Sequence, residues 1–377
     1  QETAFLMEEF MNRRYEFRYN TQIGEVEYRE RFSFQFYFHP IDKRAQNSIM
    51  LDAQSEGIGV WDRDIDRYLH SNRVPIYNPL EEFLFHLPHW DGKDRIHALA
   101  NRVPCKNPHW ELLFHRWFLN MVSHWRGVDK MHANNTSPIL VGRQGTHKST
   151  FCREMIPPAL RAYYTDSIDF SQKRDAELYL NRFALINIDE FDQITLPQQG
   201  FLKHILQKPV VNLRKPHGRS VLELQRYASF IGTSNQKDLL TDPSGSRRFI
   251  CIEVTGNIDT TQPIDYEQLY AQAIHEIYHG ERYWFDSEDE QIMTENNREF
   301  EQTPAMLQLF YQYFKTAQTK EEGEFLTPVE ILNFLKKKSG ISLSDNKVYH
   351  FGRLLQKCGI PSKHTYKGTV YQVIKVL

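Results

Sequence analysis

The sequence predicts an α/β fold in which a mostly parallel sheet forms the centre of the chain. The first observation is a series of five short apolar runs of strand length, at 137–142, 162–166, 183–189, 228–234 and 248–254. The stretches between these runs are long enough to hold connecting helices or loops. The second observation is that polar residues follow several of the runs directly. Buried apolar strands alternating with helices are typical of parallel sheets covered on both faces.

Length and composition limit the class of protein. The 377 residues suffice for two or three domains, and the formal net charge of -2 provides no overall basic field. The four cysteines are isolated from one another, which disfavours a zinc site or a disulfide framework and suggests a reducing compartment. No apolar run approaches the roughly 18 residues of a membrane span. We therefore expect a cytoplasmic protein without a membrane partner.

Residues 1–104 are expected to form a mostly helical N-terminal domain that contains one β-hairpin. Two segments with alternating side chains, 15–19 and 25–29, flank the polar stretch 20–24, which is a hairpin pattern. Apolar residues at helical spacing follow, and no catalytic pattern is recognisable in this part. Its aromatic residues are interpreted mainly as core rather than as a binding platform.

The most informative stretch is 142–150, which follows the first apolar run and precedes a helical pattern. Strand, glycine-containing loop, Lys-Ser and helix is the layout of a phosphate-binding loop, whose backbone N–H groups point at phosphate oxygens. There Lys148 would supply charge for the terminal phosphates and Ser149 a hydroxyl for Mg²⁺. A chance loop is the alternative, because His147 stands where glycine usually precedes the lysine. The candidate cofactor-binding residues are Gly142, Gln144, Gly145, Thr146, His147, Lys148, Ser149 and Thr150.

Two later strand ends carry the polar groups that such a loop needs opposite it. One run ends in Asp189-Glu190, and the next ends in Thr-Ser-Asn, of which Asn235 is the last. Asp189 is the candidate Mg²⁺ ligand together with Ser149, and Glu190 is the candidate base that orients and deprotonates a water molecule. Asn235 can hydrogen-bond the γ-phosphate or that water. Each strand end alone is a weak signal, but the combination with the loop is strong.

Two arginines, Arg247 and Arg248, directly precede the last apolar run. An arginine at this place can reach a transferred phosphate, often in a neighbouring subunit, and stabilise the developing charge. Ordinary surface arginines are the alternative. The candidate catalytic residues are thus Lys148, Asp189, Glu190, Asn235, Arg247 and Arg248.

A hairpin with a basic tip is predicted over 210–224, where two β-prone arms flank Lys-Pro-His-Gly. A solvated turn explains the same pattern equally well. If the tip binds nucleic acid, phosphate contacts are expected from Arg214, Lys215, His217 and Arg219.

Residues 105–283 are expected to form the central domain that contains the five strands of the sheet and the basic hairpin. The acidic stretch 284–324 is expected to be a solvated linker or helix. The tail, 325–377, has nine Lys and Arg against two Asp and Glu, a formal charge of +7. Its order of helix, helix and two-stranded hairpin is that of a winged helix. A wing that docks a protein is the alternative to DNA binding. The candidate DNA contacts are Lys336, Lys337, Lys338, Lys363 and Lys367.

The ordered motifs resemble those of the virulence-associated E (VirE-like) family. They are GRQGTHKST at 142–150, LINIDE at 185–190, the Lys-Pro-His hairpin, GTSN at 232–235 and SRRF at 246–249. The likeness extends over roughly 60–285, and the tail resembles a small uncharacterised domain attached to some members. That family is similar to superfamily 3 helicases and phage-type primase–helicases of the AAA+ class. The resemblance implies a P-loop (AAA+-like) ATPase that uses ATP and Mg²⁺, binds DNA and forms a homo-oligomer such as a hexameric ring.

Two functions fit these patterns. The first is ATP hydrolysis coupled to DNA translocation, unwinding or remodelling in mobile-element or phage-type replication, which the basic hairpin favours. The second is a nucleotide-switched, oligomeric DNA-binding or defence-signalling ATPase without helicase activity, which His147 favours. A small-molecule kinase is disfavoured, because an Asp-Glu pair at a strand end is suited to activating water.

Overall fold

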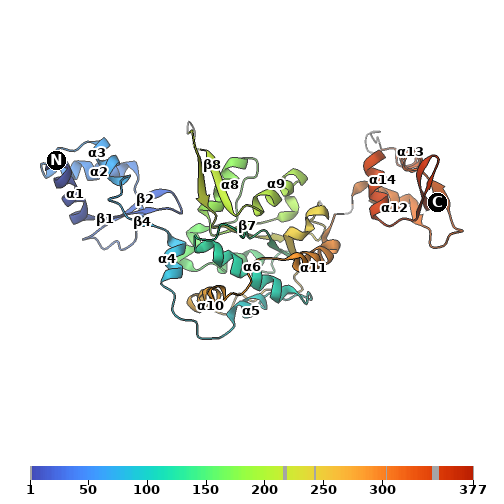
Figure 1. Cartoon of the computed structure of the whole chain (residues 1–377), viewed down its shortest axis with the longest axis horizontal. Helices are drawn as coiled ribbons and strands as arrows, with labels where there is room; N and C mark the ends of the chain where they lie inside the picture. The colour runs from blue at the N-terminus through green and yellow to red at the C-terminus, as the bar shows by residue number, and fades with distance from the viewer. Residues whose placement is uncertain (1, 215–218, 242, 303, 342–347, 377) are drawn as a thin grey trace. The chain divides into compact units, whose positions relative to one another are not determined.

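The computed structural model describes residues 2–214, 219–241, 243–302, 304–341 and 348–376 of the chain (Figure 1). The packing divides the chain into two compact units, Gln1–Glu301 and Gln302–Leu377. Within the described ranges, no helix has both the length and the apolar character that a membrane crossing requires.

The centre of the first unit is a five-stranded sheet in which every pairing is parallel. Its strands are β5 (Ser137–Val141), β6 (Tyr164–Thr165), β7 (Leu185–Ile188), β10 (Ser229–Ser234) and β11 (Phe249–Glu253). Their order across the sheet is β11-β5-β10-β7-β6, so β10 lies between β5 and β7 and pairs with both. The α/β prediction and the parallel sheet built from these five runs are confirmed. The connections that leave β5, β7 and β10 start at one edge of the sheet.

Helices cover both faces of this sheet (Figure 1). They are α6 (Trp110–Trp125) and α10 (Tyr266–Tyr278) on one face, and α8 (Lys173–Arg182) and α9 (Leu196–Leu206) on the other. Successive side chains of a strand point to opposite faces, so Leu140 packs in the core with α6 whereas Ile139 packs in the core with α9. Four of the strands, β5, β7, β10 and β11, are buried on both faces, which explains why they read as apolar runs, whereas β6 at the edge is only half-buried. Two shorter helical segments complete this part, α7 (Lys148–Glu154) after β5 and the 3-10 helix η1 (Pro158–Tyr163).

A smaller core lies at the start of the first unit. Its elements are α1 (Glu2–Arg14), β1 (Tyr15–Asn20), β2 (Glu25–Glu30), β3 (His39–Pro40), α2 (Lys43–Ser55), α3 (Asp62–Leu69) and β4 (Ile76–Tyr77). The strands form one sheet in the order β3-β2-β1-β4. The hairpin expected from the sequence is present as β1 and β2, with Tyr15 opposite Glu30. We call these elements, residues 2–77, the N-terminal lobe.

The N-terminal lobe ends earlier than the boundary at 104 that we expected. Helices α4 (Pro79–Phe85) and α5 (Arg95–Ala100) place Leu80, Ile96 and Leu99 in the core formed by α6 and α10. Their apolar faces are buried against α6, which a search for linker composition does not detect. The packing therefore assigns both helices to the central part of the chain.

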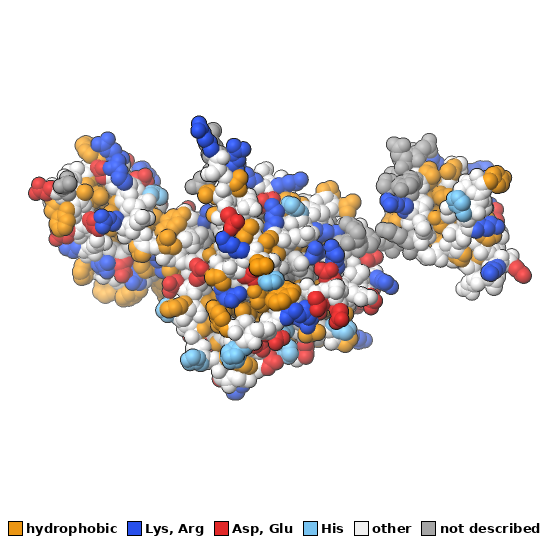
Figure 2. All heavy atoms as spheres, in the orientation of Figure 1, with side chains coloured by type: hydrophobic (Ala, Val, Ile, Leu, Met, Phe, Trp, Pro, Cys, Tyr) orange, Lys and Arg blue, Asp and Glu red, His pale blue; other side chains and the backbone are white. Residues whose placement is uncertain are grey.

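The predicted basic hairpin is present as a two-stranded antiparallel sheet apart from the central one. It consists of β8 (Val210–Arg214) and β9 (Val221–Gln225), with Arg214 opposite Val221. Figure 2 shows basic side chains at its far end. Lys215 and His217, two of the expected phosphate contacts, lie outside the described residues.

The acidic stretch 284–324, which we expected to be a solvated linker or helix, is divided between the two units, and residues 284–301 are packed into the first. This packed part contains α11 (Ser287–Asn297) and the 3-10 helix η4 (Arg298–Phe300). Asp289 is buried and forms ion pairs with Arg116 of α6 and with Arg282, the latter at 2.8 Å. Carboxylates paired with arginines that are distant in sequence hold this helix in place, and sequence composition alone does not reveal such pairs.

The second unit starts at 302 rather than at 325. Its elements are α12 (Ala305–Tyr313), β12 (Phe314–Thr316), β13 (Glu324–Leu326), α13 (Pro328–Ser339), α14 (Val348–Lys357), β14 (Ser362–Thr365) and β15 (Gly368–Lys375). β15 pairs with the other three strands, and Leu307 and Phe310 of α12 complete the core. The earlier start follows from this packing, because α12 supplies one side of that core.

Candidate functional site

A pocket of about 310 Å³ lies where β5, β7 and β10 end. Parallel strands bring their carboxyl ends to one edge of a sheet, and ligands of open α/β sheets bind there. The pocket is lined by Gln144, Gly145, Thr146, His147, Lys148, Ser149, Thr150, Asp189, Glu190, Thr233, Ser234 and Asn235. The structure thus brings together the loop, the acidic pair and the asparagine, which the sequence separates by up to 91 positions.

The loop after β5 curves tightly enough to return its lysine to the pocket. Gly142 lies close to the end of β11, where an added Cβ would meet the Val254 carbonyl oxygen at 3.2 Å, and Gly145 has a φ of +82°. Lys148 is buried, and its ammonium donates to the carbonyl oxygens of Gly142 and Arg143, both at 2.8 Å. Burial lowers the pKa of Lys148, and the nearby carboxylates of Asp189 and Asp192 oppose that shift.

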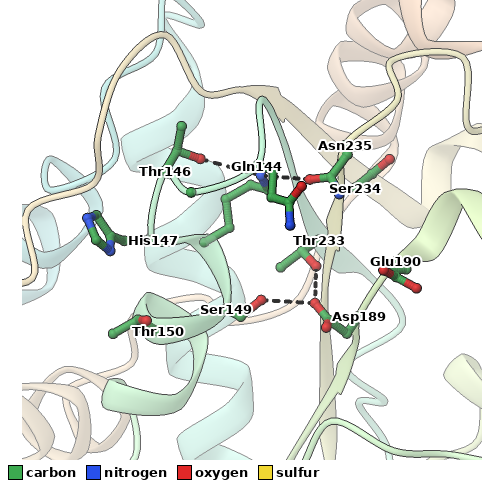
Figure 3. Close-up of a pocket in the computed structure, with 12 residues that line it drawn as sticks. Gln144, Thr146, His147, Ser149, Thr150, Asp189, Glu190, Thr233, Ser234 and Asn235 are labelled. Carbon is green, nitrogen blue, oxygen red and sulfur yellow. Dashed lines mark hydrogen bonds between the residues drawn. The ribbon is translucent and has the colours of Figure 1, made fainter.

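Asp189 connects the three strand ends through one carboxylate oxygen. Its Oδ1 accepts a hydrogen bond from Ser149 Oγ at 2.9 Å and another from Thr233 Oγ1 at 2.5 Å. In Figure 3 these three side chains point toward one another, whereas His147 and Glu190 point away from them. The strand register explains the meeting, because Gly232 pairs with Ile188 and so sets Thr233 beside Asp189.

Asn235 contacts the loop directly. Its Oδ1 accepts from Lys148 Nζ at 3.2 Å, which joins the end of β10 to the first residue of α7. Next to it, Ser234 Oγ donates to Asp192 Oδ1 at 2.9 Å. Thr233, Ser234 and Asp192 were not among our candidates. The alternation of side chains along β10 could have indicated Thr233, because residues 233 and 235 point to the same side of a strand.

Backbone strain is concentrated in this pocket. Among the described non-glycine residues, only His147 and Glu190 have positive φ angles, 68° and 52°. His147 occupies the left-handed region directly before α7, which is a conformation that glycine adopts without steric cost. The position is therefore one where glycine would relieve strain. Non-glycine residues in this region are typical of functional sites, and such strain costs on the order of 1–3 kcal/mol.

The two candidate arginines lie outside the pocket of their own chain. Both belong to the 3-10 helix η3 (Pro243–Arg248) and face Glu290 of α11, at 3.5 Å from Arg247 and 3.7 Å from Arg248. The Arg247 side chain is 51% exposed, whereas that of Arg248 is only 10% exposed. Burial also lowers the pKa of Arg248. Arg247 is accordingly the one with freedom to reach another molecule.

The expected nucleic-acid contacts are spread over two surfaces. On the hairpin, Arg219 is exposed, and the backbone carbonyl of Arg214 accepts a hydrogen bond from Arg174 of α8. In the second unit, three of the lysines form the last turn of α13 and two lie on or beside β14: Lys336, Lys337, Lys338, Lys363 and Lys367. Lys363 Nζ stands 3.7 Å above the Phe325 ring, so part of this charge packs on an aromatic face.

Two known protein families match successive parts of the chain. Residues 84–302 match the virulence-associated protein E-like domain, and residues 303–373 match a domain of unknown function described from B. Theta (DUF3874). The chain belongs to the virulence-associated protein E-like family. The first match contains every pocket residue, and the change from one family to the next falls within two residues of the division between the two packed units.

Individual proteins similar to this virulence-associated protein E-like chain are found only among solved structures, at low sequence identity. No curated protein matches it. Among solved structures, the apo NrS-1 C-terminal region (305–718) is similar at 12% identity with a TM-score of 0.49 and full coverage of both chains. The A form of that apo region has 12% identity, a TM-score of 0.47, and coverage of 99% of this chain and 100% of the other.

The donor set of the pocket fits a nucleotide with Mg²⁺. Ser149 Oγ and Asp189 Oδ1 are hard oxygen donors 2.9 Å apart, the type of ligand that Mg²⁺ selects. Lys148 is a cation directed into the same pocket, and the loop before it presents backbone N–H groups at the start of α7. Together, these groups match the negative charge and the metal ion of an ATP–Mg²⁺ complex.

Proposed function

We propose that this chain is an ATPase that couples hydrolysis to DNA translocation, unwinding or remodelling in mobile-element or phage-type replication. One observation carries the proposal. Lys148, Ser149, Asp189 and Asn235 arise from three different strand ends and converge on one pocket. That set of one cation, one hydroxyl, one carboxylate and one amide is what cleavage of a phosphoanhydride bond by water requires.

Each side chain has a role in this proposal. Lys148 and the loop N–H groups would hold the terminal phosphates, and Ser149 and Asp189 would hold Mg²⁺, which neutralises phosphate charge when bound. Glu190 would orient and deprotonate the attacking water, and Asn235 would hydrogen-bond that water or the γ-phosphate. The contacts of Lys148 with the Gly142 and Arg143 carbonyl oxygens keep its ammonium at the mouth of the loop until phosphate oxygens replace them.

The hairpin supplies a physical route from the pocket to DNA. Between β9 and β10, the buried Arg226 donates to the carbonyl oxygens of Leu206, Lys208, Ala228 and Asn134, all within 2.9 Å. The hairpin base is thereby attached to the start of β10, the strand that ends directly before Asn235. We propose that a change of ligand at Asn235 shifts the hairpin and its arginines, Arg214 and Arg219, along a DNA strand. Lys336–Lys338 of the second unit would add duplex contacts, with β14 and β15 as a wing.

A second candidate function is a nucleotide-dependent switch that assembles on DNA but does not unwind it. His147 favours it, because a strained non-glycine residue before Lys148 makes closure of the loop around phosphates harder. In that case turnover would be slow and binding of ATP would drive assembly. Homo-oligomer formation is common to both candidates.

Measuring ATP hydrolysis with and without single-stranded DNA tests the proposal. For Glu190→Gln we expect turnover to fall about 10²–10⁴-fold, the range attributed to general-base catalysis, with ATP binding retained. Glu111→Gln, an exposed carboxylate on α6, is the matched control and should not change turnover. Stimulation by single-stranded DNA together with unwinding of a forked duplex would establish the first function. ATP-dependent assembly without unwinding would establish the second, and equal rates for Glu190→Gln and the wild type would contradict the first.

A further inference from the structure

The connection from β2 to β3 carries four large side chains that face solvent. Phe32 is 90% exposed, Phe34 97%, Phe36 72% and Tyr37 86%. Hydrophobic side chains gather along the lower edge of the N-terminal lobe in Figure 2. Scattered single apolar residues on a surface are ordinary, but a contiguous cluster marks an interaction site. We call residues 31–38 the aromatic loop.

Both ends of the aromatic loop are fixed. At the start, Arg31 donates from Nε to the Asn12 carbonyl oxygen at 2.6 Å. Near the end, Arg29 donates to the Phe36 carbonyl oxygen at 2.9 Å, and its guanidinium lies 4.5 Å from the Phe38 ring. The exposed rings are therefore presented by a backbone that is held on both sides, which lowers the entropic cost of binding a ligand on them.

A cavity of about 460 Å³ adjoins the aromatic loop and shares Arg31 and Phe38 with it. Its lining includes Arg18, whose guanidinium lies between the rings of Phe38 at 4.0 Å and Tyr77 at 3.7 Å. Arg73 also lines it, and its side chain is 65% exposed while pairing with Glu8 at 3.2 Å. Flat aromatic faces next to guanidinium groups are the chemistry that recognises a base attached to a phosphate.

The carboxylates of this cavity are already paired. Glu16 accepts from Arg29 and pairs with Arg31 at 3.4 Å, and the hydrogen bond from Arg29 lowers its pKa. Glu82 is hydrogen-bonded to His86 at 3.1 Å, and its side chain is half exposed. The segment 31–41 itself contains no Asp or Glu. The surface that the aromatic loop presents is thus neutral to basic, although the whole chain is slightly acidic.

We propose that the aromatic loop and the adjoining cavity bind single-stranded nucleic acid. Bases would stack on Phe32, Phe34 and Phe36, and the phosphates between them would meet Arg31 and Arg73. Stacking of this kind tolerates any sequence, since every base has a flat face. Aromatic and arginine side chains also occur at protein interfaces. Nucleic acid is the better match, because the exposed rings at 32, 34 and 36 alternate with the uncharged Ser33 and Gln35 and no carboxylate in the segment 31–41 would repel phosphates. The proposal rests on the proposed function only for the choice of nucleic acid as the ligand.

The test measures binding of the full chain to fluorescent oligothymidylate of about 16 nucleotides, the upper site size of common single-strand binders. No nucleotide is added, and fluorescence anisotropy reports the dissociation constant. We expect Phe32→Ala/Phe34→Ala/Phe36→Ala to weaken binding at least about tenfold, within the range found when one stacking partner is removed. A matched control is Phe85→Ala, which removes an equally exposed ring (81%) from α4. Thermal unfolding should be unchanged, because the replaced rings are exposed.

Leucine at the same three positions separates stacking from general hydrophobicity. The leucine variant keeps apolar area but has no flat face, and we expect it to bind as weakly as the alanine variant. A direct reporter is Phe34→Trp, whose fluorescence should be quenched by the oligonucleotide. Wild-type affinity in the alanine variant, or full affinity in the leucine variant, would overturn the proposal. If the alanine variant instead sediments as a smaller species than the wild type while binding the oligonucleotide normally, the aromatic loop is a surface between copies of this chain.

The outcome is independent of catalysis. The aromatic loop lies outside the pocket, so the alanine variant should keep the wild-type rate of ATP hydrolysis without DNA. An inactive wild type with intact, loop-dependent oligonucleotide binding would reject the ATPase and retain the loop as a binding surface. If the wild type hydrolyses ATP but its affinity for the oligonucleotide is unchanged in the alanine variant, the ATPase is retained and the loop is rejected as a binding surface.

Discussion

The pocket at the ends of β5, β7 and β10 and the β8–β9 hairpin are held in different ways. In the pocket, Lys148, Ser149 and Asp189 are hydrogen-bonded to one another or to the ends of strands that are buried on both faces. The hairpin has two strands, and three of the five residues of β9 are exposed. It is attached at the base through Arg226 and the Lys208–Glu177 ion pair at 3.0 Å. Further along its strands, Arg174 of α8 donates to the Arg214 carbonyl oxygen, and Lys130 pairs with Glu223 at 2.7 Å.

The difference teaches where precision is needed. In the proposed function the pocket residues act on a phosphoanhydride bond, which requires placement to within a fraction of an ångström, and these residues stand at the ends of strands that are buried on both faces. In the proposed function the hairpin contacts a DNA backbone, which requires charge and reach rather than such precision. Among the contacts that hold the hairpin, those of Arg226 are the most deeply buried.

The largest expected effect tests whether the pocket of one chain is complete. Arg247 and Arg248 lie outside it, and we expect one of them to act on the nucleotide of a neighbouring subunit. Replacing both by alanine should lower ATP turnover by about 10³–10⁵-fold, the value of an arginine supplied to this reaction in GTPases. Arg247→Ala alone should account for most of the lost rate, because its side chain is the more exposed of the two.

Mixing variants decides whether these arginines act between subunits. Lys148→Ala holds phosphate poorly but still donates its arginines, and the double arginine variant does the opposite. Each alone should be nearly inactive, whereas a mixture should recover part of the activity at interfaces that pair an intact loop with an intact arginine. If mixtures that demonstrably co-assemble stay inactive, the pocket does not depend on its neighbour and the arginines act within their own chain or not at all.

The next effect concerns the base of the hairpin. Arg226 is fully buried, and burial lowers its pKa to about 9, so the guanidinium remains charged at neutral pH. Arg226→Met would leave four carbonyl oxygens without a donor and should lower the free energy of unfolding by about 3–5 kcal/mol. Arg153→Met, an exposed arginine of α7, should change it by less than about 0.5 kcal/mol. Denaturant midpoints followed through the buried tryptophans of α6 measure both, and equal midpoints would show that the hairpin base is held by other contacts.

The pocket could be predicted from the sequence to a large extent, and the hairpin base could not. Gly-x-x-Gly-x-x-Lys-Ser after an apolar run has a local physical cause, and so do polar residues at the ends of strands. The partners of Arg226 are backbone carbonyls at 134, 206, 208 and 228, which no side-chain pattern reveals. Likewise, an acidic composition suggested a linker at 284–324, although Asp289 is buried between two arginines.

The same reasoning explains the errors at domain boundaries. Helices α4 and α5 have apolar faces whose partner, α6, follows Pro104–Pro108, so proline-rich composition suggested a boundary where the packing has none. The N-terminal aromatics were interpreted as core, which is right for Phe10, Tyr15 and Phe17 but wrong for the aromatic loop. Composition does not distinguish a buried phenylalanine from an exposed one.

A smaller effect is expected from the lysines at the end of α13. Replacing Lys336, Lys337 and Lys338 by glutamine should weaken duplex DNA binding by about tenfold and reduce the salt dependence of the binding constant, by up to about 0.9 in slope for each lost phosphate contact. Filter binding over a series of salt concentrations measures both. These lysines also lie where cations stabilise the end of a helix. Reduced stability of the second unit with unchanged DNA binding would assign them that structural role.

The smallest effect concerns the residue that departs from the usual loop, and it bears directly on the rigidity of the pocket. His147→Gly should remove the cost of a left-handed residue, about 1–2 kcal/mol. The greater freedom of glycine in the unfolded chain offsets about 0.5–1 kcal/mol of this gain. We therefore expect a net stabilisation of at most about 1.5 kcal/mol, measured as a higher denaturant midpoint at unchanged slope.

His147→Ala is the variant that separates the backbone from the imidazole. Alanine keeps the Cβ and therefore the strain, so it should not raise the midpoint, whereas glycine should. The two variants also distinguish the two candidate functions. If strain slows closure of the loop around phosphate, only glycine raises the rate of ATP hydrolysis, and the native histidine sets a slow, switch-like turnover. If the imidazole itself obstructs the pocket, both variants raise the rate equally. A rate that falls in both would mean that the imidazole assists the reaction, and the loop would then be adapted to histidine rather than impaired by it.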